Sequence, residues 1–209
     1  MNILHTQAFR KFIFWIGTVR KLSTFPWVTW DHHDPKVTHE EISEIMKLIK
    51  PGDVGLHRDR GFLSNLFIPG KFKHAWIHVN KDEIIEATKD GVKQKSCRYP
   101  MRTDDLVIVR PKLSALARKE AVKKAQEVVG FSYDVEFDFD LKESFFHLNK
   151  HDQAFSCIEV IAYAYYKYFE ELGFEWQFSL GKKVLYPGVV INPAWDVVYS
   201  NDPEIKVTI

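Results

Sequence analysis

The sequence predicts an α+β domain in which a mainly antiparallel sheet packs against helices, preceded by an N-terminal helical extension. Several strand-like segments follow one another between helical segments, which is typical of α+β folds. Two of these segments are separated by only a few residues, as in a β-hairpin. The chain has 209 residues and is 45% apolar, which is enough to build the core of one large domain.

The charge balance and the cysteine count narrow the class of protein. Lys and Arg total 29 and Asp and Glu total 28, so no strong field favours a nucleic-acid partner. The two cysteines, Cys97 and Cys157, imply no disulfide framework. The apolar run at residues 12–19 is too short to span a bilayer, and no clear signal-peptide cleavage site follows it. We therefore expect a cytoplasmic protein.

Residues 1–37 form an aromatic-rich extension, in which we expect a short helix over about His5–Lys21. Basic residues flank its apolar part, and this leaves two interpretations. The segment contacts a membrane surface, or it packs against the domain formed by residues 38–209. We favour packing, because a stripe of aromatic residues usually belongs to a core.

The first half of the domain predicts one helix followed by strands. Thr38 and Glu41 form a capping box at the start of a helix that Pro51-Gly52 ends. Gly, Ser, Asn and Pro over residues 61–73 indicate a long loop. The predicted strands are Asp53–His57, His74–Val79, Ile84–Thr88 and Asp105–Arg110.

The second half predicts two more helices and an extended tail. Residues 131–155 between the helices look irregular. The predicted elements are a helix from Ser114 to about Val129 with Gly130 after it, a helix from Cys157 to about Leu172 ended by Gly173, and extended runs in the tail such as Gly188–Ile191.

Cys157 is the candidate nucleophile. Ser156 and Glu159 form a second capping box, so the thiol lies in the first turn of a helix. Unpaired backbone N–H groups and the helix dipole at that position favour the thiolate form. The alternative is an ordinary buried cysteine, which is the commoner fate of a lone Cys.

A histidine on the predicted hairpin can serve as the base. His74 can lie directly opposite Glu86 across the turn, and the carboxylate would then orient the imidazole. His78 on the same strand and His57 on the preceding strand are rival bases. The alternative for Glu86 is a solvated strand residue.

Other chemistries have less support. His147 and His151 have the i,i+4 spacing of a metal-binding pair, but the segment lacks helical periodicity and no third ligand has a matched spacing. In His32-His33-Asp34 the adjacent side chains diverge. No Gly-x-Ser-x-Gly sequence supports a serine hydrolase. We expect neither a metal nor another cofactor.

Several segments also occur in the order of a known family. The chain resembles the bacterial YiiX/YaeF-like permuted papain-like amidases, a family of cysteine peptidases and amidases within the NlpC-type papain-like superfamily, over roughly residues 50–195. The segments are Pro51-Gly52-Asp53-Val54, Lys73-His74-Ala75-Trp76-Ile77, Ile84-Ile85-Glu86-Ala87, Gly91-Val92, Val107-Ile108-Val109-Arg110-Pro111, Gly130-Phe131-Ser132-Tyr133-Asp134, Ser156-Cys157-Ile158-Glu159 and the turn Ile191-Asn192-Pro193.

The resemblance implies a circularly permuted papain-like catalytic domain over residues 38–209, in which histidine precedes cysteine. It maps the nucleophile to Cys157, the base to His74 and the third polar residue to Glu86. It implies cleavage of an amide bond in a peptide, a peptidoglycan fragment or an N-acyl amino acid.

The resemblance also implies the surroundings of the site. Tyr133 matches an aromatic position near the cleft, and Trp76 stands where the family usually has a small residue. With Phe155 they are the expected substrate-binding residues, and nearby aromatic residues favour an acyl or lipid-like substrate.

Two other functions fit the same order of residues. Acyltransferases of the lecithin–retinol acyltransferase kind also place histidine first, but they typically carry Asn-Cys-Glu-His where this chain has Ser156-Cys157-Ile158-Glu159. A non-catalytic module could keep the cleft to bind a lipid or a peptide.

Overall fold

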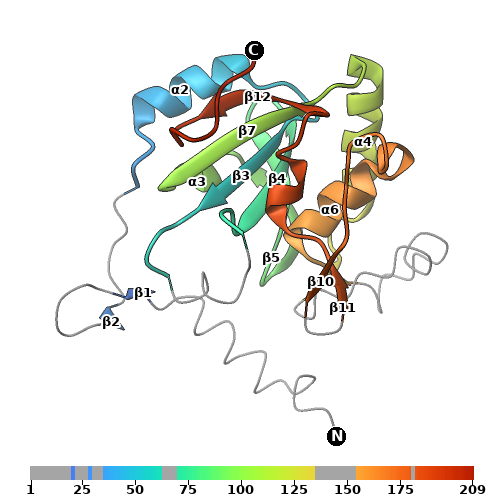
Figure 1. The fold of residues 1–209 in the computed structure, drawn as a ribbon, viewed down its shortest axis with the longest axis horizontal. Helices are drawn as coiled ribbons and strands as arrows, with labels where there is room; N and C mark the ends of the chain where they lie inside the picture. Colours follow the sequence, from blue (N-terminus) through green and yellow to red (C-terminus); the bar gives the residue numbers. More distant parts are fainter. Residues whose placement is uncertain (1–19, 22–27, 30–34, 63–69, 135–153, 180–181) are drawn as a thin grey trace, which may run out of the picture.

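A six-stranded antiparallel sheet forms the centre of the protein in a computed structural model (Figure 1). The structure describes residues 20–21, 28–29, 35–62, 70–134, 154–179 and 182–209. The strand order is β12-β7-β3-β4-β5-β6, and every neighbouring pair is antiparallel. The strands are β3 (Val54–Arg58), β4 (His74–Asn80), β5 (Glu83–Thr88), β6 (Gly91–Ser96), β7 (Asp105–Pro111) and β12 (Trp195–Ser200).

Helices cover the two faces of this sheet (Figure 1). Side chains alternate along β7, so Val107 and Val109 join one apolar cluster while Leu106 and Ile108 join the other. The first cluster includes α4 (Ala115–Glu127) and α6 (Cys157–Ala164), and the second includes α2 (His39–Leu48). The predicted α+β class with a mainly antiparallel sheet is confirmed.

Short elements complete the described chain. They are the strand pairs β1 (Arg20–Lys21) with β2 (Val28–Thr29), β8 (Ser132–Tyr133) with β9 (Ala154–Phe155) and β10 (Gln177–Ser179) with β11 (Lys182–Val184), the helix α3 (Arg98–Met101), and the 3₁₀ helices η3 (Tyr166–Tyr168) and η4 (Pro187–Val190). No helix among the described residues is long and apolar enough to cross a membrane.

The capping boxes fix where two helices begin. At α2, Thr38 accepts from the backbone N–H of Glu41, whose carboxylate accepts from the N–H of Thr38. Val37, the last residue of the predicted extension, is buried with the α2 cluster, and its N–H donates to the carbonyl of Thr103. The domain boundary after residue 37 stays a prediction.

Glycine allows a close approach inside the sheet. Gly55 on β3 pairs with Trp76 on β4, and a Cβ atom at Gly55 would lie 2.0 Å from Cζ2 of the Trp76 ring. The indole therefore lies on the glycine backbone, with its whole side chain buried in the α2 cluster.

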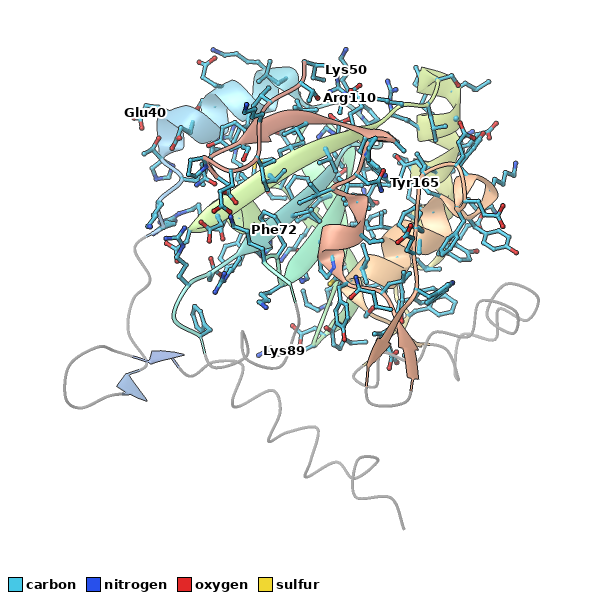
Figure 2. The ribbon with its side chains drawn as sticks, in the orientation of Figure 1. Glu40, Lys50, Phe72, Lys89, Arg110 and Tyr165 are labelled. Atoms are coloured by element: carbon cyan, nitrogen blue, oxygen red, sulfur yellow. The ribbon has the colours of Figure 1, made fainter. Side chains whose placement is uncertain are left out.

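Hydrogen bonds join the turn before β3 to the helices on both faces of the sheet. Arg110 donates twice to the buried carboxylate of Asp53 and once to the carbonyl of Leu48. Figure 2 shows Arg110 close to Lys50, whose backbone N–H donates to the same carboxylate. From the other side of the turn, the Tyr165 hydroxyl donates to the carbonyl of Gly52.

The helix that starts at Cys157 is shorter than predicted. It ends at Ala164, and the N–H of Tyr168 donates to the carbonyl of Tyr165 in a tighter 3₁₀ turn. Tertiary contacts explain the change, because Tyr165 is held by Gly52 and the ring of Phe169 stacks on Phe174.

One further prediction of secondary structure is wrong, one strand was not predicted, and one predicted helix falls mostly outside the described residues. Residues 188–190 lie in η4, because Pro187 is preorganised to start a helical turn. Strand β6 was not predicted, since Lys93 and Lys95 interrupt its apolar pattern. Of the predicted helix His5–Lys21, the structure describes only Arg20–Lys21, which is the strand β1.

Candidate active site

Cys157 is the first residue of α6, as the capping box predicted. The carboxylate of Glu159 accepts a hydrogen bond of 2.6 Å from the backbone N–H of Ser156, the N-cap. The first N–H groups of a helix lack intrahelical partners, so the thiol lies beside free donors and the positive end of the helix dipole. The residue is buried, with 4% of its surface exposed.

His74, the first residue of β4, interacts with both Cys157 and Glu86. Its Nε2 lies 3.1 Å from Oε2 of Glu86. Burial alone would lower the pKa of His74, but the charge of Cys157, a hydrogen bond with its thiol, and the Glu86 carboxylate outweigh burial and raise the pKa to about 10. Since Nε2 faces Glu86, Nδ1 is the nitrogen left for the thiol.

Glu86 on β5 is buried and doubly paired. Its second oxygen, Oε1, lies 2.5 Å from the amine of Lys95 on β6, and its side chain is 3% exposed. Burial alone would raise the pKa of Glu86, but the hydrogen bond to His74, the charge of His74 and then Lys95 lower it to about 2. The alternative that Glu86 is a solvated strand residue is therefore wrong.

The register of the hairpin differs from the prediction that His74 and Glu86 lie directly opposite each other. Ile77 pairs with Ile85, and a bulge between His78 and Asn80 shortens the turn. Continuing this register places Trp76 opposite Glu86, so His74 and Glu86 are diagonal neighbours. Diagonal side chains lie about 7–8 Å apart at their backbones, within reach of a histidine and a glutamate.

The rival bases have other surroundings. The ring of His57 lies 4.8 Å from that of His74, and burial, followed by the charge of His74, lowers the pKa of His57 to about 3. His78 is buried near the other end of β4, and burial lowers its pKa as well. Cys157 contributes to the titration of neither, so His74 is the histidine that it influences.

Of the three expected substrate-binding residues, only Tyr133 has the predicted surroundings. Its pKa is raised well above the usual value, first by burial and then by the charge of Cys157, so the phenol lies near the thiol. Phe155 is fully buried in the core against Phe131 and Tyr163. Trp76 is fully buried on Gly55. The substrate-binding role expected for Trp76 and Phe155 is wrong, because neither side chain offers surface to a ligand.

The second cysteine belongs to the core. Cys97 is fully buried, and its Sγ lies 3.3 Å from the sulfur of Met46. Burial is the main cause that raises the pKa of its thiol, which keeps it protonated and unreactive.

Sequence reasoning missed Lys95, the second partner of Glu86. A lysine in a strand usually indicates a solvated face, and β6 was not recognised. Had a second hairpin been predicted after residue 88, the alternation of side chains would have placed Lys93 and Lys95 beside Glu86.

The histidines weighed as metal ligands, His32, His33, His147 and His151, lie outside the described residues. Across the part of the chain that the structure describes, no group of three His, Cys, Asp or Glu side chains could hold a metal ion.

Comparison with known proteins finds one solved structure to report. No family model matches the sequence, and no curated protein matches it. The structure is similar to the crystal structure of the metalloprotein yiiX from Escherichia coli O157:H7, with a TM-score of 0.59 and 19% sequence identity. The match covers 75% of this chain and 99% of that one. The chain therefore has a YiiX-like fold.

Proposed function

We propose that the protein is a cysteine-dependent hydrolase that cleaves an amide bond through a thioacyl-enzyme. One observation carries the proposal: His74 contacts a buried carboxylate through Nε2, and a cysteine at a helix start raises its pKa. A nucleophile, a base and a group that orients the base are the parts that this chemistry needs.

The proposed reaction has two steps. His74 already holds the proton of the thiol as an imidazolium, and the Cys157 sulfur attacks the carbonyl carbon while N–H groups at the start of α6 stabilise the oxyanion. The imidazolium then gives its proton to the leaving amine, and the C–N bond breaks to leave the thioester. In the second step His74 takes a proton from water, whose oxygen attacks the thioester carbon. The C–S bond then breaks, the acid leaves, and the imidazolium and the Cys157 sulfur again share the proton.

Glu86 holds the imidazole during both steps. Its contact with Nε2 leaves Nδ1 available for the thiol, and its charge stabilises the imidazolium. Because Lys95 pairs with the other oxygen, the carboxylate stays ionised when His74 is neutral.

The substrate class follows the resemblance, which favours peptides, peptidoglycan fragments or N-acyl amino acids. Three of the aromatic residues that favoured an acyl or lipid-like substrate do not line a pocket. Phe72, Trp76 and Phe155 are buried in the core. Tyr133 is the aromatic residue proposed to contact the substrate.

A metal does not fit the described site. The similar structure is called a metalloprotein, but the residues around His74 in this chain are poor metal ligands as they are paired. Glu86, the carboxylate that pairs with His74 among the described residues, already binds the ammonium group of Lys95, which would repel a cation at the same oxygens.

Trapping the acyl-enzyme tests the proposal. The protein is mixed with activated acyl donors, such as p-nitrophenyl esters of N-acyl amino acids, and its intact mass is recorded within seconds. We expect one acyl group on Cys157, lost in Cys157→Ala and kept in Cys97→Ala. Acylation at Cys97, or equal acylation of Cys157→Ala, would refute the nucleophile.

Product analysis separates hydrolysis from acyl transfer. Free acid that forms equally with and without an added amine or alcohol supports the hydrolase. Acyl transfer to the acceptor in place of water would instead support the acyltransferase alternative. Binding of a peptide or lipid with no acylation at all would support the non-catalytic module.

A further inference from the structure

The three residues of the proposed site, Cys157, His74 and Glu86, are joined by a fourth charged side chain, that of Lys95. Glu86 binds His74 through Oε2 and Lys95 through Oε1, so one carboxylate joins a histidine and a lysine from different strands. The amine of Lys95 also lies 5.2 Å from the ring centroid of Tyr99, which covers it from the side of α3.

We propose that Lys95 is a positioning residue that holds Glu86 in the orientation needed by His74. The inference rests on the proposed cysteine chemistry and adds a residue to it. Lys95 touches neither the thiol nor the imidazole, so it acts only through Glu86.

The geometry separates this lysine from an ordinary surface ion pair. Glu86 is 3% exposed, so its carboxylate has little water to replace a lost partner, whereas the Lys95 side chain is 35% exposed. A carboxylate that loses one of two partners can turn about its terminal torsion, which is broad for Glu, and carry the imidazole with it.

Other charged or titratable side chains also lie near Glu86, and one of them, Lys93, provides a matched control for Lys95. His74, His57 and Lys93 surround it, in addition to Lys95. Lys93 is the direct cross-strand partner of Glu86, yet its amine lies 3.9 Å from Asp90 and its side chain is 56% exposed. Lys93→Met thus removes the same charge from the same strand without touching the carboxylate.

The kinetic test compares Lys95→Met, Lys95→Arg and Lys93→Met on the substrate found by acyl trapping. We expect Lys95→Met to lower kcat by on the order of 10-fold to 100-fold with KM nearly unchanged, because a small misplacement of the base has that effect. The acid limb of the pH profile of kcat for Lys95→Met should move to higher pH, because Glu86 loses a positive partner. Lys95→Arg should recover most of the rate, and Lys93→Met should keep the wild-type profile. An unchanged kcat and pH profile in Lys95→Met, or equal losses in Lys95→Met and Lys93→Met, would overturn the proposal.

A second readout needs no turnover. The Glu86 carboxyl carbon is titrated by NMR in protein labelled with ¹³C-glutamate, with Glu86→Gln for assignment. Lys95→Met should raise the Glu86 pKa and Lys93→Met should not. If the titration shifts as expected but the wild type shows no acylation, the hydrolase fails while the pairing stands. If acylation occurs but the titration is unchanged, Lys95 has no positioning role.

Discussion

Replacing Glu86 by Gln tests whether this carboxylate stabilises the folded protein through its two partners. The side chain keeps its shape but loses its charge. In the folded protein Glu86 has a pKa of about 2 rather than the ordinary 4.5, because His74 and Lys95 stabilise its charged form more than burial disfavours it.

The magnitude and its sign follow from linkage. A pKa lowered on folding adds stability above the unfolded value and loses it as the pH falls through the folded value. Between 4.5 and about 2 the difference corresponds to about 3 kcal/mol at pH 7, at about 1.4 kcal/mol per pH unit. At pH 3 the same relation leaves about 1.4 kcal/mol.

Urea unfolding of the wild type and Glu86→Gln at pH 7, 5 and 3 measures this difference. The matched control is Glu44→Gln, since Glu44 forms an exposed pair with Lys47 and should change stability by less than about 1 kcal/mol at every pH. A Glu86→Gln variant as stable as the wild type at pH 7, or a loss of stability that does not shrink at pH 3, would show that the charge of Glu86 does not stabilise the folded protein through His74 and Lys95.

Two further substitutions test the packing around the sheet. Gly55→Ala places a Cβ atom 2.0 Å from the Trp76 ring, so urea unfolding should show a loss of about 1–3 kcal/mol, recovered in part by adding Trp76→Leu; no loss would mean that the ring moves freely. Arg110→Met leaves the carboxylate of Asp53 buried without its guanidinium partner and should cost about 3–5 kcal/mol in the same assay, whereas a loss below about 1 kcal/mol would show that Lys50 and water replace it.

Local signals in the sequence located the candidate nucleophile and most elements of the sheet. The capping box of α2 formed as expected, because it depends only on residues three apart. At α6 the Glu159 carboxylate accepts from the N–H of Ser156 as expected, whereas the buried Ser156 hydroxyl has no hydrogen-bond partner among the described residues. The hairpin bearing His74 and Glu86 was also recognisable, since its two strands are close in sequence. Its bulge at Val79 was not, because nothing in the local pattern distinguishes an extra residue in a strand from a regular one.

The features that the sequence did not predict depend on contacts between residues far apart in the chain. Whether an aromatic side chain lines a cleft or fills a core depends on what packs against it, so the sequence could not show that Trp76 and Phe155 are core residues. The substrate contact of Tyr133 stays a prediction. The early end of α6 depends on Tyr165 reaching Gly52, more than a hundred residues earlier in the chain. Lys95 belongs to the same class, because only strand pairing brings it to Glu86.

Alkylation of Cys157 at pH 6 tests directly whether His74 activates this cysteine as a nucleophile. Protein is treated with iodoacetamide at pH 6, where an ordinary thiol with a pKa of about 8.5 reacts slowly, and the modified residue is identified by peptide mass spectrometry. We expect rapid modification of Cys157, none of the buried Cys97, and a rate at Cys157 that falls in His74→Ala while the unfolding curve shows a folded variant. Modification of Cys97 with Cys157 left intact, or a rate at Cys157 that does not depend on His74, would contradict this activation.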